Sequence, residues 1–287
     1  MTQLSDIMVS WQLLKARLKN SLSKNPPIII YQMGKVGSKS VVTSVRKHYR
    51  NVYHVHRMNP LHINRIQTEA ADYRHLQLND HIGLWLYSTV VRKRKVAKFI
   101  TLVREPIARN ISAFFENMAC SIKRNSRPDI DQLIDTFLKQ YPHSVPLTWF
   151  DLEMKQTLEI DIYQYRFPKD LGFFHLKNGD HEVLVMKSEL DDSVKAECIA
   201  DFLGVDDFQL IKENVGQSKS YGSIYQQFLK NILLPEDYIT KMYNSKYAQH
   251  FYTAQEIQQA RFKWSKGLNQ ALSPDNTFGY GTQGLGL

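Results

Sequence analysis

One stretch near the start of the chain constrains the fold most strongly: residues 27–45, with the sequence PIIIYQMGKVGSKSVVTSV. It opens with the three isoleucines of residues 28–30, a β-branched run without polar interruption, which is typical of a buried parallel strand. Glycines, lysines and serines follow, and then Val41, Val42 and Val45 return at helical spacing. The stretch therefore predicts a strand, a glycine-bearing loop and a helix.

The loop between this strand and this helix is suited to an anion, because backbone N–H groups and a helix N-terminus point at one place. Two glycines allow the backbone to turn close to a ligand, two lysines add positive charge, and two serines add hydroxyl donors. These residues are Gly34, Lys35, Gly37, Ser38, Lys39 and Ser40. The alternative interpretation is a turn that binds nothing.

The loop does not match the Walker A motif, G-x-x-x-x-G-K-[ST]. Counting back from Lys39 and Ser40 places Ser38 and Met33 where that motif has its glycines. The predicted strand at residues 98–103 ends in Arg104 and Glu105 rather than in the aspartate that holds Mg²⁺ in P-loop NTPases. The loop is therefore suited to phosphate but not to a magnesium–nucleoside triphosphate.

The composition bounds the class of protein. The chain has 287 residues, enough for one large α/β domain or for one domain with a helical appendage, and its 43% hydrophobic and 23% charged residues are typical of a soluble globular protein. Its net charge of +9 favours an anionic ligand without choosing among nucleotide, acidic polysaccharide and nucleic acid.

Cys120 and Cys198 have no metal-site spacing, and Asp6 and Gln12 interrupt the apolar core that a signal peptide needs. We expect free thiols and a cytoplasmic protein without an integral membrane segment.

Patterns along the rest of the chain are mainly helical. Residues 4–22 predict an amphipathic helix whose apolar stripe packs on the domain, although its basic outer face could instead lie on a membrane. We expect the helix to occupy residues 1–26, the main domain residues 27–270, and a flexible tail residues 271–287. Strands are predicted at 52–56, 98–103, 172–177 and 182–187, and further helices at 61–78, 82–97, 193–204, 224–233, 236–249 and 254–266.

A second informative stretch runs from Arg104 to Ser112, REPIARNIS. Arg104 stands at the C-terminal end of a predicted strand, where ligands of open α/β sheets bind, and Ser112 lies two turns into the next helix. An arginine fork with a hydroxyl suits a phosphate monoester. Arg104 could alternatively cap a helix or pair with Glu105.

Together the two stretches resemble the sulfotransferases that use 3′-phosphoadenosine 5′-phosphosulfate (PAPS). Residues 34–40 look like that family's 5′-phosphosulfate loop, and residues 104–112 fill every fixed position of its 3′-phosphate motif, R-x-P-x-x-R-x-x-S. Weaker similarities occur at residues 184–190 and 202–204, so the resemblance covers about residues 27–222. The chain looks most similar to bacterial sulfotransferases of polysaccharide biosynthesis, including proteins labelled as capsular polysaccharide synthesis proteins. Lys39 departs from the pattern, because the family usually has Thr or Ser there.

The resemblance implies a three-layer, P-loop-like α/β sulfotransferase fold with a mostly parallel central sheet and extra helices. It implies PAPS as co-substrate, no metal, and a hydroxyl or amine of a carbohydrate-type acceptor. Lys35 would contact the bridging oxygen and the 5′-phosphate, and Arg104, Ser112 and Lys219 would contact the nucleotide, the first two at its 3′-phosphate. Gly37, Ser38, Lys39 and Ser40 would cradle the 5′-phosphate, and Gly34 and Val36 would belong to the same nucleotide-binding loop.

A hydroxyl acceptor needs a base to take its proton. His56 is our preferred candidate, because it lies at the C-terminal end of the predicted strand 52–56, on the ligand side of the sheet, and His54 would point to the same face. Glu116 and His143 are lesser candidates. A purely structural role is the alternative for each histidine.

Two other functions compete with the sulfotransferase hypothesis. An ATP-dependent kinase would need the Walker glycines and the magnesium aspartate, and a non-catalytic glycan-binding module would not need Lys35, Arg104 and Ser112 intact. Binding to nucleic acid has only the net charge and the cluster of residues 92–95 in its favour. We expect no nucleic-acid partner.

Overall fold

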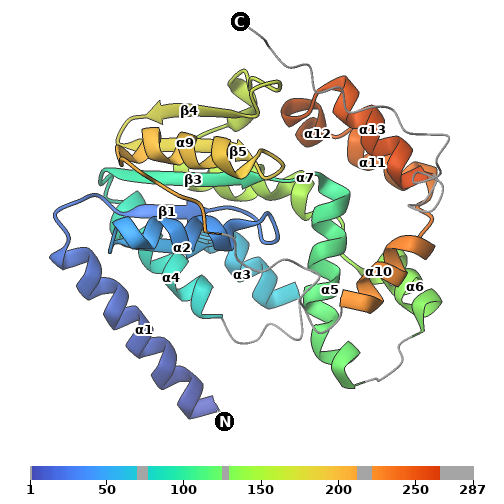
Figure 1. Cartoon of the computed structure of the whole chain (residues 1–287). Helices are drawn as coiled ribbons and strands as arrows, with labels where there is room; N and C mark the ends of the chain where they lie inside the picture. Colours follow the sequence, from blue (N-terminus) through green and yellow to red (C-terminus); the bar gives the residue numbers. More distant parts are fainter. Residues whose placement is uncertain (1, 70–76, 125–128, 212–221, 266–287) are drawn as a thin grey trace, which may run out of the picture.

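The computed structural model describes residues 2–69, 77–124, 129–211 and 222–265. Five strands form one sheet in the order β2-β1-β3-β5-β4 (Figure 1). Four of them run parallel, and β4 pairs antiparallel at the edge. The strands are β1 (Ile28–Tyr31), β2 (Val52–Val55), β3 (Ala97–Val103), β4 (Phe173–Asn178) and β5 (His181–Lys187). The predicted mostly parallel α/β sheet is confirmed.

The first strand is buried on both faces, as its isoleucines predicted. Ile29 and Ile30 are fully buried, because β1 lies between β2 and β3 and both faces of the sheet are covered. Ile28 is opposite Val52 in β2 and Lys98 in β3, so the three strands start together and their carboxyl ends meet at one edge. That edge carries the loop that follows β1.

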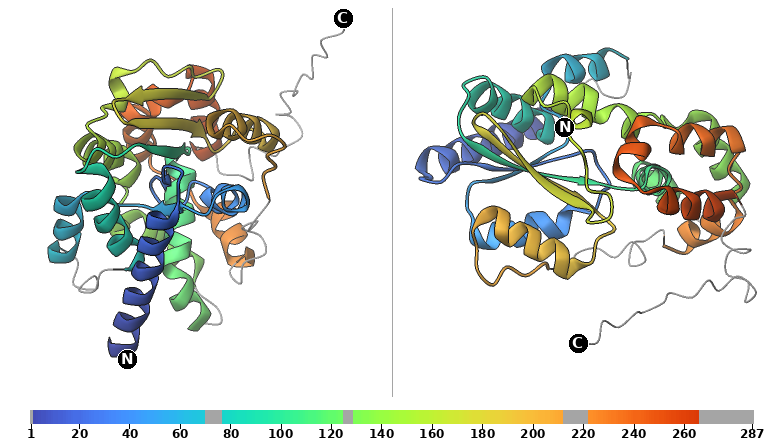
Figure 2. Two further views of the ribbon diagram at one scale, coloured as in Figure 1. Left: turned by 90° about the vertical axis from the view of Figure 1, so that its left-hand side faces the viewer. Right: turned by 90° about the horizontal axis from the view of Figure 1, so that it is seen from above.

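Helices cover both faces of the sheet (Figure 2). One face carries α2 and α9, and the other carries α4 with the short π-helix η2 and the helical segment that begins at α7. These elements are α2 (Ser38–His48), α9 (Asp192–Leu203), α3 (Pro60–Glu69), α4 (Leu78–Leu86), η2 (Tyr87–Val91), α7 (Val145–Trp149), η3 (Phe150–Lys155), α8 (Gln156–Leu158) and η4 (Ile162–Gln164).

A group of helices continues beyond the carboxyl edge of the sheet, on the right in Figure 1. Aromatic side chains join three of them: the Phe114 and Phe137 rings lie 5.4 Å apart, and those of Phe115 and Phe228 lie 5.0 Å apart. We call these elements the helical group: α5 (Pro106–Arg124), α6 (Ile130–Gln140), α10 (Gly222–Asn231), α11 (Glu236–Tyr243), α12 (Lys246–Phe251) and α13 (Ala254–Ser265).

Three predicted helix boundaries were wrong. The helix expected at 82–97 ends as η2, because the chain turns at Arg94 (φ +48°) and Ala97 joins the sheet, its N–H donating to the Asp180 carbonyl at 3.1 Å. The helix expected at 236–249 breaks before Ser245, whose hydroxyl accepts from the Ala248 N–H and caps α12. The helix expected at 61–78 does not reach its predicted end, because Gln77 has extended backbone and Leu78 begins a new helix, α4; residues 70–76 lie outside the described residues.

The N-terminal helix α1 (Thr2–Leu22) was predicted correctly as a helix but wrongly as to the side on which its apolar stripe packs. It lies against the domain through Ala16, whose carbonyl accepts from the Tyr53 hydroxyl at 2.9 Å, and through the half-buried Leu13. The larger apolar side chains of the stripe remain exposed to solvent. They are Trp11, Leu14, Leu18 and Leu22.

A buried carboxylate fixes the chain just after β2. Glu153 of η3 is fully buried and accepts hydrogen bonds from the Tyr31 hydroxyl (2.5 Å) and from the Met58 and Asn59 N–H groups (2.8 and 3.1 Å). Its second oxygen bonds to the His62 ring. Because the donors come from β1, from the segment after β2 and from α3, this one side chain holds the carboxyl end of β2 in place.

We expect Gly83→Ala to destabilise the protein. A Cβ at Gly83 in α4 would lie 2.0 Å from the Arg57 carbonyl oxygen, so the helix must move away from the segment that follows β2. Such overpacking costs about 1–3 kcal/mol. Urea unfolding measures this loss, with the exposed Gln132→Ala in α6 as control. Unchanged or higher stability, as expected at an open helical site, would contradict the close approach.

Candidate functional site

The predicted anion loop lies at the carboxyl edge of the sheet, between the end of β1 and the start of α2. Gly37 is the N-cap of α2 with φ +84°, a conformation that favours glycine, and a Cβ there would meet no atom within 4 Å. Lys35 also has a positive φ, +73°, although it is not a glycine. The predicted strand, loop and helix are therefore confirmed, and the loop exposes the N-terminus of α2.

Two arginines of the second stretch hold the loop. Arg104 donates from Nη1 to the Lys35 carbonyl at 2.9 Å, and Arg109 donates from Nε to the Gly34 carbonyl at 2.9 Å. Arg109 is buried and also bonds to Asn110 and to the Tyr141 hydroxyl; its burial lowers the guanidinium pKa from the ordinary value. The two stretches singled out in the sequence are thus in direct contact.

Glu105 caps the helix that follows and does not pair with the arginine before it. Its carboxylate accepts from the Ile107 and Ala108 N–H groups at 2.7 and 2.8 Å, in the first turn of α5. The same carboxylate accepts from the Tyr243 hydroxyl (2.8 Å) and the Trp264 indole (3.2 Å). Glu105 therefore joins α5 to the C-terminal helices, and the alternative interpretation of an internal Arg–Glu pair is wrong.

Lys35 points toward α5. Its Nζ donates to Glu116 Oε2 at 3.1 Å in a partly exposed ion pair. An anion that binds the lysine would therefore compete with this carboxylate. Glu116, a lesser candidate for the base, is held beside the loop by the same contact.

Both strand-end histidines lie against the loop. The His54 Nε2 atom hydrogen-bonds to Ser38 Oγ at 3.0 Å, and His56 Nδ1 lies 2.9 Å from the Gln32 carbonyl oxygen. The two rings are 4.7 Å apart, so they share a face as predicted. A Cβ at Gly34 would lie 3.8 Å from His56 Nε2, which places that nitrogen over the loop.

Both histidines are neutral near pH 7. Burial, together with the neighbouring His56, Arg46 and Lys39, lowers the pKa of His54 to about 3. Burial also lowers the pKa of His56. Because His56 Nδ1 faces a carbonyl oxygen, that nitrogen carries the hydrogen and Nε2 carries the lone pair. An imidazole in this state can accept a proton at Nε2.

His143, another candidate for the base, is not at the loop. Its Nε2 hydrogen-bonds to the Phe137 carbonyl at 2.8 Å, and its Nδ1 bonds to the Tyr238 hydroxyl at 3.0 Å. Both ring nitrogens are therefore engaged within the helical group. This favours the structural role that we gave as the alternative.

The remaining predicted site residues fall into different environments. Val36 is fully buried in the core, so only its backbone can face a ligand. Lys39 is exposed on the first turn of α2. Ser40 is half-buried and lines a small cavity of about 50 Å³ together with Gly37, and with Lys195 of α9.

The two ends of the proposed 3′-phosphate motif are not joined directly. Ser112 is half-buried in α5, and no hydrogen bond between these two described residues links it to Arg104. Lys219 lies outside the described residues. The sequence did not identify Tyr247, whose hydroxyl accepts from the Arg104 N–H at 3.0 Å and donates to its carbonyl at 2.8 Å. No local motif marks this tyrosine, 143 residues away.

Comparison with known proteins gives one family match. Residues 121–253 match the family model described as "NKWYS: Putative capsular polysaccharide synthesis protein". The match covers less than half of the chain. It includes β4 and β5 and helices α6 to α12, but neither the loop after β1 nor the segment from Arg104 to Ser112. No curated protein and no solved structure matches the chain.

None of the helices in the described part of the chain is both long enough and apolar enough to cross a membrane. Within the same residues, no group of three or more His, Cys, Asp or Glu side chains is placed to hold a metal ion.

We expect the stability of the protein to fall as the pH drops below 6.5, in part through His54. Its pKa is about 3 when folded and about 6.5 when unfolded. The unfolded chain therefore binds more protons between these values. This one group contributes a loss of about 2 kcal/mol between pH 7.5 and 5. Urea unfolding of wild type and His54→Gln at both pH values measures it. Parallel pH curves for the two proteins would contradict the burial of His54.

Proposed function

We propose that this chain is a sulfotransferase that moves a sulfuryl group from PAPS to a hydroxyl or amine of a carbohydrate-type acceptor. The observation that carries the proposal is the contact between the two stretches that resemble the PAPS motifs. Arg104 and Arg109 donate to the carbonyls of Lys35 and Gly34, so both motifs belong to one site. The family match to a capsular polysaccharide synthesis protein supports a polysaccharide acceptor.

The loop is suited to the 5′-phosphosulfate. The N-terminus of α2 is exposed beside Gly37, where a ligand meets no side chain within 4 Å of the Cβ position. Lys35 and Lys39 would add positive charge, and the loop itself contains no acidic residue. We assign Gly34 to Ser40 to this phosphate, with the buried Val36 contributing only its backbone.

Arg104 is suited to a phosphate monoester. A guanidinium carries five N–H donors in a planar fork, so the bond to the Lys35 carbonyl leaves others for an oxyanion. The backbone of Arg104 is fixed on both sides by the Tyr247 hydroxyl. We assign Arg104 and Ser112 to the 3′-phosphate, which distinguishes PAPS from ATP, and keep Lys219 as a further nucleotide contact.

The residues around the loop fit the chemistry of sulfuryl transfer. PAPS supplies the sulfuryl group and a phosphate leaving group. Lys35 and the N–H groups at the start of α2 would stabilise the negative charge that develops on the leaving oxygen. His56 would accept the acceptor's proton at Nε2, while the bond from its Nδ1–H to the Gln32 carbonyl holds the ring and its tautomer.

We expect Arg104→Ala to weaken binding of adenosine 3′,5′-bisphosphate, the product nucleotide, by about 10–100-fold, since a hydrogen bond to a charged group contributes about 1.5–3 kcal/mol. Calorimetry of wild type, Arg104→Ala and the exposed control Arg92→Ala measures this. Adenosine 5′-monophosphate, which lacks the 3′-phosphate, should lose less affinity than the bisphosphate on the same change, because it can lose only the support that Arg104 gives to the Lys35 carbonyl.

Other results would count against the assignment. Equal weakening for both nucleotides would mean that Arg104 acts only by supporting the loop. Tighter binding of Mg-ATP than of the bisphosphate, or binding of neither, would contradict the sulfotransferase proposal.

We expect His56→Gln to lower sulfuryl transfer by about 10²–10⁴-fold, the usual contribution of a general base, with bisphosphate affinity unchanged. His54→Gln, on the same face, is the matched control and should lose less. Transfer of radiolabelled sulfate from PAPS to a panel of polysaccharides measures both. Because the pKa of His56 is lowered, the rate should fall only below pH 6.5. If the His56→Gln variant transferred sulfate at the rate of the wild type, His56 would be excluded as the base.

A further inference from the structure

The outward side of α1 carries an apolar stripe that the domain does not cover. Its four side chains are 50–82% exposed, although each is a large hydrophobic residue. The opposite side of the helix makes the contacts with the domain, through Ala16 and Leu13. The stripe consists of Trp11, Leu14, Leu18 and Leu22.

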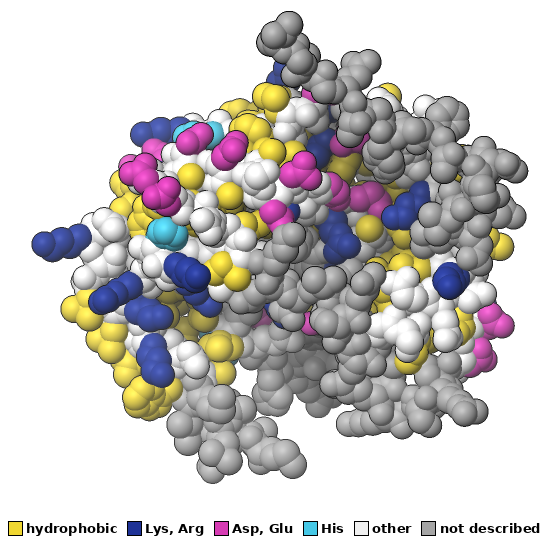
Figure 3. Space-filling view, viewed as in Figure 1, with side chains coloured by type: hydrophobic (Ala, Val, Ile, Leu, Met, Phe, Trp, Pro, Cys, Tyr) yellow, Lys and Arg dark blue, Asp and Glu magenta, His cyan; other side chains and the backbone are white. Residues whose placement is uncertain are grey.

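Positive charges flank the stripe on both sides. At about 100° per residue, the four apolar side chains fall within an arc of about 80°. On the same wheel Lys15 and Lys19 project on one side of the arc and Arg17 on the other. All three are exposed, and Lys15 Nζ lies 5.0 Å from the centre of the Trp11 ring. Figure 3 shows hydrophobic side chains along the outer edge of α1 with Lys and Arg side chains beside them.

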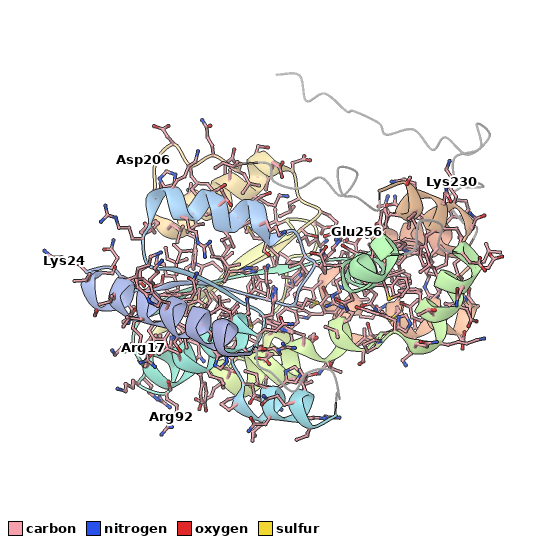
Figure 4. All side chains as sticks on the ribbon, turned by 90° about the horizontal axis from the view of Figure 1, so that it is seen from below. Arg17, Lys24, Arg92, Asp206, Lys230 and Glu256 are labelled. Atoms are coloured by element: carbon pink, nitrogen blue, oxygen red, sulfur yellow. The ribbon has the colours of Figure 1, made fainter. Side chains whose placement is uncertain are left out.

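The sequence that includes most of α1 and continues beyond it carries, over a long stretch, charged side chains of positive sign only. Between Asp6 and Glu69 the chain has eleven lysines and arginines and no aspartate or glutamate. Figure 4 shows Arg17, Lys24 and Arg92 on the side of the molecule that carries α1, with Asp206 farther from the helix at the same end. The outer face of α1, with its lysines and arginine, is therefore complementary to a negatively charged surface.

A lipid surface fits this helix better than a second copy of the chain does. The stripe is only about 16 Å long, at 1.5 Å per residue, whereas each partner in a stable protein complex buries about 800 Å². A second copy would also bring like charges together. An apolar stripe with cations at both borders is the pattern of helices that lie in the headgroup region of anionic membranes.

We propose that the outer face of α1, defined as the stripe with Lys15, Arg17 and Lys19, binds the surface of membranes rich in anionic lipid. The apolar side chains enter the boundary between headgroups and acyl chains, and the cations remain among the lipid phosphates. The helix lies on the membrane without crossing it. This inference does not depend on the sulfotransferase activity, and its test uses no nucleotide.

Vesicle flotation of the full chain tests the proposal. We expect the protein to float with phosphatidylcholine vesicles that contain about one-third phosphatidylglycerol, and to stay in solution with pure phosphatidylcholine. Binding should weaken at least tenfold near 1 M salt, where the screening length falls to about 3 Å. Absence of binding to the anionic vesicles would overturn the proposal.

Paired variants separate the stripe from general surface effects. Leu14→Glu with Leu18→Glu should reduce binding to anionic vesicles by more than tenfold. Leu171→Glu with Leu233→Glu is the matched control, because these leucines are 60% and 66% exposed elsewhere on the domain and the charge change is the same. Equal losses in both double variants would mean that net charge alone drives binding, and would overturn the role of α1.

Trp11 provides an internal reporter of where the protein touches the lipid. It is the exposed tryptophan of the four, since Trp85, Trp149 and Trp264 are each at most 8% exposed. Its emission should shift to shorter wavelength on anionic vesicles, and Trp11→Phe should remove the shift while flotation persists. If light scattering instead finds a dimer that Leu14→Glu with Leu18→Glu converts to monomer, the occupant is a second copy, and the proposal fails.

Discussion

The arrangement of the candidate site depends on hydrogen bonds between arginine side chains and loop carbonyls. Gly34 and Lys35 both direct their carbonyl oxygens at guanidinium groups, one of them the buried Arg109. In a trans peptide the C=O and N–H point in opposite directions, so anchoring these carbonyls turns the N–H groups of Lys35 and Val36 away from the two guanidinium groups. The arginines thus orient the loop's dipoles, in addition to any direct contact with an anion.

Local patterns in the sequence were sufficient to predict the elements but not the contacts between distant segments. The isoleucine run and the loop glycines each encode their own geometry. Periodicity also identified α1, but it could not say which side packs, because this helix has apolar residues on two sides. Helix ends were missed where a partner in the sheet, as at Ala97, outweighed the helical pattern.

Within the site, too, the sequence predicted where residues lie but not the contacts that they make with distant segments. That His54 and His56 would lie beside the loop followed from the rule that ligands gather at the carboxyl ends of parallel strands. Their protonation state and tautomer could not be predicted from the sequence, since these depend on burial and on the Gln32 carbonyl that fixes the His56 tautomer. The pairing of Lys35 with Glu116 joins residues 81 positions apart and has no local signature.

At Lys35 the stability of the fold and the positive charge of the loop favour different residues. A side chain in the left-handed region costs about 1–2 kcal/mol relative to glycine, and Lys35 adopts φ +73° at the centre of the loop. Glycine at this position would relieve the strain and remove the cation. A library of variants screened for thermal resistance alone would therefore enrich chains without this lysine. The residue enriched at position 35 would thus show whether a library had been selected for folding stability or for the function of the site.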